Sequence, residues 1–80
     1  MELQRAVLDV VVEQIHMDEA QIDNTWTLLD LGATSFASVQ LFMLLEERFG
    51  IEFSSDQVAD LAVLPILRFH EVVSRARAAS

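Results

Sequence analysis

The hydroxyl of Ser35 is the side-chain group in this sequence with the clearest potential for chemistry. It follows a glycine and two small residues in the stretch DLGATSF and precedes a strongly apolar segment. A serine nucleophile on a strained turn needs the pattern G-x-S-x-G, but Gly32 lies three residues before Ser35 and Ala37 replaces the second glycine. Such a nucleophile also needs an oriented base, and the histidines, His16 and His70, fall at the end of one predicted helix and midway along another. The pattern therefore favours a serine without a catalytic role.

Two other roles stay open for Ser35. Thr34 and Ser35 both carry an oxygen that can accept hydrogen bonds from the unpaired amides of a first helical turn, so Ser35 can act as a helix cap. A hydroxyl at a helix start, next to a glycine-containing loop, is also accessible to a modifying enzyme. A phosphate ester formed there would lie at the favourable end of the helix dipole. In that second case Ser35 is a substrate for modification.

The acidic residues form no recognisable metal-binding pattern. Adjacent pairs such as Glu46 and Glu47 point in different directions on a helix, and no spacing resembles a calcium loop. The chain contains no cysteine, which removes thiol-based metal sites and disulfides. We therefore expect no metal ion and no catalytic residue.

Composition predicts one small helical domain spanning residues 1–80. The chain is 52% apolar with two glycines and one proline, which is typical of a folded helical protein. Its formal charge of -8, from 13 acids against five arginines, repels phosphate backbones and anionic lipids, so we expect no nucleic acid and no membrane as a partner. The charged N-terminal segment resembles neither a signal peptide nor a membrane span. These features predict a cytoplasmic protein.

Four helices are predicted to build the domain around Ser35. Apolar residues recur every three or four positions over residues 2–15, which indicates an amphipathic first helix. A second helix is predicted from Ser35 to Phe49, ended by a glycine, and a short third helix begins at Ser54 or Ser55. The last helix is expected to have Pro65 in its first turn and to run to about residue 78.

The connection over residues 16–34 is unusually long for a compact domain. Asp18 is expected to cap a single helical turn within it, and Asn24, Thr25 and Asp30 are expected to form turns. Its apolar side chains are expected to tuck under the helices: Ile22, Trp26, Leu28, Leu29 and Leu31.

The second predicted helix has apolar residues on two faces. A helical projection places one set toward the core: Ser38, Leu41, Phe42, Leu45 and Phe49. The opposite set also contains large apolar side chains: Phe36, Val39, Gln40, Met43 and Glu47. An exposed apolar cluster beside a helix start predicts a contact surface for other proteins. The alternative is a central helix that is covered on both faces.

The segment DLGATSFASVQLFMLLEERFGIEF resembles the modification segment of the phosphopantetheinyl carrier proteins, which include acyl, peptidyl and aminoacyl carriers. Their pattern is Leu-Gly-x-x-Ser-apolar, followed by a helix that ends in Glu-Glu-x-Phe. The resemblance covers nearly the whole chain and implies an all-α, four-helix up-down bundle with a long first loop and a short third helix. It also implies that Ser35 carries 4′-phosphopantetheine from coenzyme A, whose thiol holds cargo as a thioester. The protein itself is then not an enzyme.

The same resemblance implies three kinds of partner for a monomeric shuttle. A phosphopantetheinyl transferase attaches the arm, an adenylate-forming ligase or acyltransferase loads it, and a downstream transferase or synthase unloads it. The resemblance assigns their docking to the start and outer face of the second helix: Thr34, Phe36, Val39, Gln40, Met43 and Glu47.

Departures from the family pattern bear on the cargo. Thr34 stands where the family commonly has aspartate, which indicates a dedicated or tolerant transferase. Ala37 and Gln40 replace acids that are usual in fatty-acid carriers, and Arg48 precedes the last Phe of the helix. These differences favour a stand-alone carrier of an aminoacyl or specialised acyl group. The alternatives are a fatty-acid or polyketide acyl carrier and, from a different class, an unmodified helical interaction module.

Overall fold

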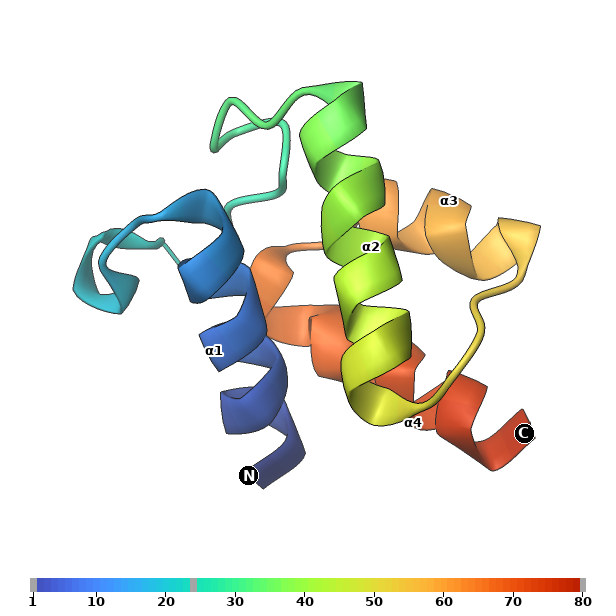
Figure 1. Cartoon of the computed structure of the whole chain (residues 1–80). Helices are drawn as coiled ribbons and strands as arrows, with labels where there is room; N and C mark the ends of the chain where they lie inside the picture. Colours follow the sequence, from blue (N-terminus) through green and yellow to red (C-terminus); the bar gives the residue numbers. More distant parts are fainter. Residues whose placement is uncertain (1, 24, 80) are drawn as a thin grey trace.

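The computed structural model describes residues 2–23 and 25–79, and every regular element in that part of the chain is helical. The elements in order are α1 (Glu2–Ile15), η1 (Glu19–Gln21), α2 (Ser35–Phe49), α3 (Ser55–Val63), η2 (Ile66–Arg68) and α4 (Phe69–Ala79). In Figure 1, α1 runs upward beside α2, which runs downward, and α4 crosses below them. Helix α4 packs against α1, α2 and α3. The expected all-α bundle with a short third helix is confirmed.

The core is apolar and lies between the four helices. Among the described residues no buried side chain is polar or charged. The predicted core face of α2 supplies Leu41, Phe42 and Leu45, while Ser38 and Phe49 at its ends are only partly buried. Complete burial of such a side chain stabilises the fold by roughly 1.5 to 3 kcal/mol. Helix α2 is therefore anchored along one face, and this holds its N-terminus at a fixed place.

Both ends of α2 are set by specific residues. At the C-terminus Gly50 adopts a left-handed conformation with φ of 64° and donates its amide hydrogen to the Glu46 carbonyl, as predicted. The carboxylate of Glu46 then accepts a hydrogen bond of 2.8 Å from the amide of Phe53. This contact fixes the short segment that leads from α2 to α3.

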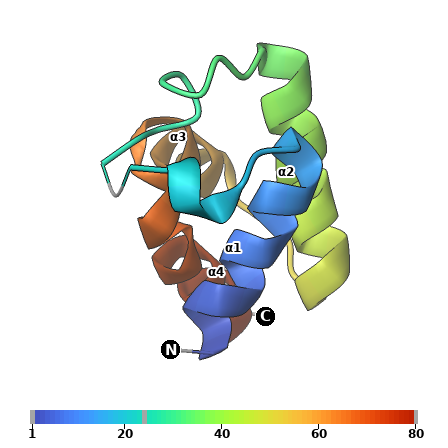
Figure 2. The same ribbon diagram turned by 90° about the vertical axis from the view of Figure 1, so that its left-hand side faces the viewer.

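The long loop is held by turns and by one link to a distant segment. Asp18 accepts a hydrogen bond from the amide of Ala20 at the start of η1, as expected, and Thr25 and Asp30 both take part in turns. Asn24 lies outside the described residues. The amide of Ile66 donates to the Trp26 carbonyl at 2.9 Å, which ties the loop to the segment between α3 and α4. Figure 2 shows the loop crossing one end of the bundle before it reaches α2.

One of the five predicted loop anchors is wrong. Leu28 is buried, and Ile22, Trp26 and Leu31 are partly buried, but the side chain of Leu29 is 80% exposed. Residues 27–33 form a tight turn in which Leu31 donates to Thr27 and Ala33 donates to Leu28 through their backbones. Leu28 and Leu29 are neighbours in this turn, and only the first lies against the core.

The expected start of the last helix is also wrong. Pro65 lies outside α4, because the 3₁₀ turn η2 comes between them and α4 begins at Phe69. The backbone at Pro65 is extended, with ψ of 142°, and this directs the next amide to the Trp26 carbonyl. Helix α3 is capped by Ser54 and not by Ser55. No helix in residues 2–23 and 25–79 is both long and apolar enough to cross a membrane.

Candidate functional site

Ser35 is the first residue of α2, and its side chain is exposed. The residue before it caps the helix: Thr34 is extended, with φ of -74° and ψ of 165°, and its Oγ1 accepts a hydrogen bond of 3.1 Å from the amide of Ala37. The interpretation of Ser35 as the cap is therefore wrong. The Ser35 hydroxyl has no hydrogen-bond partner among the described residues. The other role, as a site of modification, stays a prediction.

The preceding turn places Thr34 and Ser35 at the surface. Gly32 has φ of 77°, a left-handed conformation that residues with a side chain rarely adopt. The carboxylate of Asp30 accepts hydrogen bonds from the amide and hydroxyl of Thr27, at 2.9 Å and 3.2 Å, and holds the other side of the turn. The chain therefore arrives at α2 in a defined direction.

Two apolar hollows lie beside Ser35. An open groove of about 370 Å³ is lined by Ser35 itself, by Leu29 and Ala33 from the turn, and by Phe42 and Ala62 from α2 and α3. A smaller hollow of about 270 Å³ lies under the turn, between the end of α1 and the start of α2. Its apolar lining is Ile15, Leu28, Leu31, Ala33, Ala37 and Leu41. The site thus joins an accessible hydroxyl to apolar space.

The outer face of α2 is exposed, as the helical projection predicted. Phe36, Val39 and Met43 are 71%, 51% and 62% exposed, and Thr34, Gln40 and Glu47 also lie at the surface. The alternative in which both faces of α2 are covered is therefore wrong. A groove of about 420 Å³ runs along this face and reaches Gln14 of α1.

Sequence reasoning missed two exposed apolar residues. Leu29 was expected in the core, and Val63, at the end of α3, was given no role but is 71% exposed. A helical projection of residues 55–63 separates Val63 from the buried Leu61, so the signal for Val63 was available in the sequence. No periodic signal exists for Leu29, because a turn has no helical repeat.

The charged groups of the molecule provide no catalytic apparatus at Ser35. His16 is exposed at the end of α1, and the Nδ1 atom of His70 lies 3.0 Å from the Leu67 carbonyl. The described part of the chain contains no cluster of three or more metal-ligating side chains. The first turn of α2 contains no acidic residue.

Shifted pKa values occur in the loop and on α4. The hydroxyl and the amide of Thr25 both donate to Asp23 and lower the pKa of its carboxyl. On α4 the carboxyl of Glu71 accepts two hydrogen bonds of 3.0 Å from the guanidinium of Arg68, the last residue of η2, and these bonds lower its pKa. Both groups are at the surface, and each shift follows from a local hydrogen bond.

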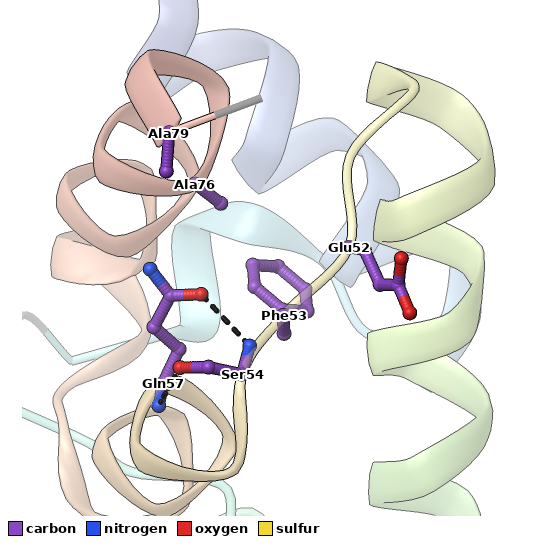
Figure 3. Close-up of a pocket in the computed structure, with 6 residues that line it drawn as sticks. All are labelled: Glu52, Phe53, Ser54, Gln57, Ala76 and Ala79. Carbon is purple, nitrogen blue, oxygen red and sulfur yellow. Dashed lines mark hydrogen bonds between the residues drawn. The ribbon is translucent and has the colours of Figure 1, made fainter.

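A hollow of about 510 Å³ lies apart from Ser35, between the start of α3 and the end of α4. Figure 3 shows that Phe53, Ala76 and the Ser54 to Gln57 hydrogen bonds surround it. There the side chain of Gln57 accepts from the Ser54 amide, and the Ser54 hydroxyl accepts from the Gln57 amide.

Known proteins are similar to this chain in sequence. Residues 5–64 match the family described as "Phosphopantetheine attachment site". The acyl carrier protein of Campylobacter hominis is 44% identical over 63 residues, which are 76% of this chain and 78% of that protein. A helical carrier fold with a modifiable surface hydroxyl and a family match of this extent define the class. The chain belongs to the phosphopantetheine attachment site family, and it is a non-catalytic carrier whose cofactor is 4′-phosphopantetheine.

Within this family the comparison bears on the cargo. The relative of 44% identity is an acyl carrier protein, and neither match names an aminoacyl or peptidyl carrier. The comparisons therefore support the acyl carrier alternative better than the aminoacyl or specialised carrier that the departures at Thr34, Ala37 and Gln40 favoured. The substitutions at Thr34 and Gln40 are weak evidence for cargo, because both residues are exposed at the surface.

Proposed function

We propose that this chain carries an acyl group as a thioester on a 4′-phosphopantetheine arm attached to Ser35, and moves it between enzymes. The observation that supports Ser35 is its exposed hydroxyl at the start of α2, which is free of hydrogen bonds because Thr34 caps the helix. The residues around it fit the group, since the first-turn amides and the helix dipole favour a phosphodiester there.

Attachment is a phosphoryl transfer in which Ser35 is the acceptor. Its oxygen forms a P–O bond to the phosphorus next to pantetheine in coenzyme A, and the P–O bond to adenosine 3′,5′-bisphosphate breaks. The serine proton passes to the phosphopantetheinyl transferase, because His16 and His70 do not contact Ser35 in the described part of this chain. The bound arm supplies a thiol, which this cysteine-free sequence lacks.

The hollows beside Ser35 support an acyl cargo. The space under the turn is lined mainly by aliphatic side chains, and the open groove leads from Ser35 along Phe42. Transfer of an alkyl chain from water to such surfaces is favourable. Transfer of the charged ammonium group of an aminoacyl cargo to the same surfaces is unfavourable. The Campylobacter hominis relative is also an acyl carrier protein.

The outer face of α2 is proposed to receive the partner enzymes. A phosphopantetheinyl transferase must reach Ser35, so its contact surface has to adjoin the start of α2. Phe36, Val39 and Met43 offer it an apolar ridge, with Thr34 and Gln40 beside them and Glu47 at the far end. The matching partner surface is therefore apolar at its centre and basic at the edge that meets Glu47. The loading ligase or acyltransferase and the unloading transferase or synthase are proposed to use the same face in turn.

The remaining predictions complete this proposal. Residues 1–80 are proposed to act as a single carrier domain, which the mutual packing of the four helices supports, and the monomeric state stays a prediction. The cytoplasm stays the predicted compartment, and the negative charge of -8 still argues against nucleic acid and anionic membranes as partners.

Intact-mass measurement tests the attachment site. The protein is incubated with a phosphopantetheinyl transferase, magnesium and coenzyme A, and we expect a gain of one phosphopantetheine unit. Ser35→Ala should gain nothing. Ser55→Ala is the matched control, because Ser55 is the exposed first residue of α3 just as Ser35 is of α2, and this variant should be modified normally. Modification of Ser35→Ala would refute the assignment, and an unmodified wild-type chain would favour the interaction module.

Thermal unfolding tests the cargo. Transferases of this kind can be supplied with acyl coenzyme A, so that the arm arrives already loaded. A medium-length alkyl chain bound in the hollows stabilises the folded state and should raise the melting temperature above that of the acetyl form. An aminoacyl carrier predicts no such difference. Equal melting temperatures for the two forms would remove the structural support for an alkyl cargo.

A further inference from the structure

We propose that Thr34 is a positioning residue for the modification of Ser35, because its side chain takes the capping role that the Ser35 hydroxyl would otherwise take. This inference rests on the proposed attachment at Ser35. It concerns how the chain keeps that oxygen available, and it assigns Thr34 a role within the carrier itself.

The hydroxyl groups of Thr34 and Ser35 are alternative caps for the N-terminus of α2. In the structure the Oγ1 atom of Thr34 accepts from the amide of Ala37, and the carbonyl of Thr34 accepts from the amide of Ser38 at 2.9 Å. Were Ser35 the cap, the helix would begin one residue later and the Ser35 oxygen would accept from the amide of Ser38. A lone pair of that oxygen would then be engaged, and its direction would be fixed toward the helix.

The cap of α2 has no second support. In α3 the cap Ser54 accepts from the amide of Gln57 at 3.2 Å and donates its own amide to the Gln57 side chain at 2.9 Å, so two hydrogen bonds fix that helix start. The equivalent third residue of α2 is Ala37, whose methyl group accepts no hydrogen bond. The side chain of Thr34 therefore supports this helix start without help from the third residue of the helix.

A hydrogen-bonding role predicts which substitutions are tolerated. The first turn of α2 has no acidic residue, and Thr34 is neutral, so the cap works here without a charge. Serine and asparagine are good caps, whereas valine has the shape of threonine but no oxygen to accept the bond. Thr34→Val therefore removes the hydroxyl and keeps the shape of the side chain, whereas Thr34→Ser keeps the hydroxyl and changes the shape.

The test is the rate of Ser35 modification by a phosphopantetheinyl transferase with coenzyme A, followed by intact mass. We expect Thr34→Val and Thr34→Ala to lower kcat/KM about fivefold, and Thr34→Ser and Thr34→Asn to restore it to within about twofold of wild type. The control is Thr25→Ala, which removes a hydroxyl bonded to Asp23 in an earlier part of the loop and should leave the rate unchanged. Circular dichroism establishes that each variant is folded.

Amide hydrogen exchange provides a second measurement that does not depend on the transferase. In Thr34→Val the Ala37 amide should lose protection while the Ser38 amide keeps it, because Ser35 replaces the lost cap. Normal modification of Thr34→Val, or slow modification of Thr34→Ser, would overturn the inference. A wild-type chain that stays unmodified would overturn the attachment site itself, so the two failures are distinguishable.

Discussion

Thr34 and Ser54 cap the second and third helices with nearly identical backbone geometry, φ of -74° with ψ of 165° and φ of -74° with ψ of 167°. Each is followed by an exposed serine, Ser35 or Ser55. The local geometry of a helix start therefore does not distinguish Ser35, the proposed attachment site, from Ser55. What differs is the surroundings: Ser35 has an apolar groove and a tight glycine turn beside it, and Ser55 follows a cap that is reinforced by Gln57.

The two caps should contribute similarly to stability but differently to modification. Ser54→Ala removes a capping box and Thr34→Ala removes a single cap, and each is expected to lower the free energy of unfolding by about 1 kcal/mol. In a domain of this size that corresponds to a fall of roughly 4 to 8 °C in melting temperature. Urea unfolding measures the first quantity. Ser54→Ala should be modified at the wild-type rate, and a slow rate would show that stability alone limits modification.

Gly32 should resist substitution for reasons of backbone conformation alone. A Cβ atom at this position would meet nothing within 4 Å, so no steric clash is expected. Its φ of 77° nevertheless costs an L-residue about 1 to 2 kcal/mol, and Gly32→Ala should destabilise the protein by that amount. Gly32→Asn should cost less, because asparagine tolerates the left-handed region better. Equal losses for the two variants would contradict this explanation.

The helices could be predicted from the sequence, because their apolar residues recur at regular spacings. Helix α2 has fifteen residues with a helical pattern, so its buried face and its exposed face could both be assigned. Leu29 could not be assigned, because each residue of a tight turn has its own direction. Pro65 was misplaced since proline fits the first turn of a 3₁₀ segment as well as that of an α-helix. The bond from the amide of Ile66, the residue after Pro65, to the Trp26 carbonyl joins distant segments, and no local pattern reveals it.

The choice between Thr34 and Ser35 was undecidable from the sequence for a related reason. Both residues are competent caps, and they differ by one position. The outcome depends on the direction in which the turn delivers the chain, and this direction is set by Gly32 and by the backbone bond from Ala33 to Leu28. The resemblance of residues 30–53 to the modification segment singled out Ser35 as the proposed attachment site, because that pattern spans more residues than a cap does.

The ion pair between Arg68 and Glu71 predicts a pH dependence of stability. Its hydrogen bonds hold the pKa of Glu71 below the ordinary value of 4.5. A carboxyl whose pKa is lower in the folded state stabilises that state above its unfolded pKa, and the contribution is lost as the pH falls through the folded pKa. Glu71→Gln should therefore be less stable than wild type at neutral pH, and the difference should vanish in acid. Urea unfolding at several pH values measures the difference in the free energy of unfolding between the two proteins. A difference that persists in acid would show that the substitution acts through side-chain packing and not through the ion pair.

The exposed and buried faces of α2 should respond in opposite ways to the same kind of change. Leu45 is completely buried, so Leu45→Asp places a carboxylate in the apolar core and should unfold the domain. Met43 and Val39 lie at the surface, so Met43→Glu and Val39→Asp should leave the circular dichroism spectrum unchanged. Both surface variants should lower kcat/KM for loading by the cognate enzyme about tenfold or more. A tenfold loss corresponds to about 1.4 kcal/mol, the free energy expected for one apolar contact at the interface.

A third surface position makes this comparison specific to the outer face of α2. Val63 is as exposed as Phe36 but lies at the end of α3, so Val63→Asp introduces the same charge on a different helix. We expect Val63→Asp to load faster than Val39→Asp, because the proposed partner surface is centred on α2. Loading rates should be compared at low and high salt, since screening reduces the effect of an added charge but does not restore a lost apolar contact. Wild-type loading of both Met43→Glu and Val39→Asp would exclude this face from the mechanism, whatever the cargo proves to be.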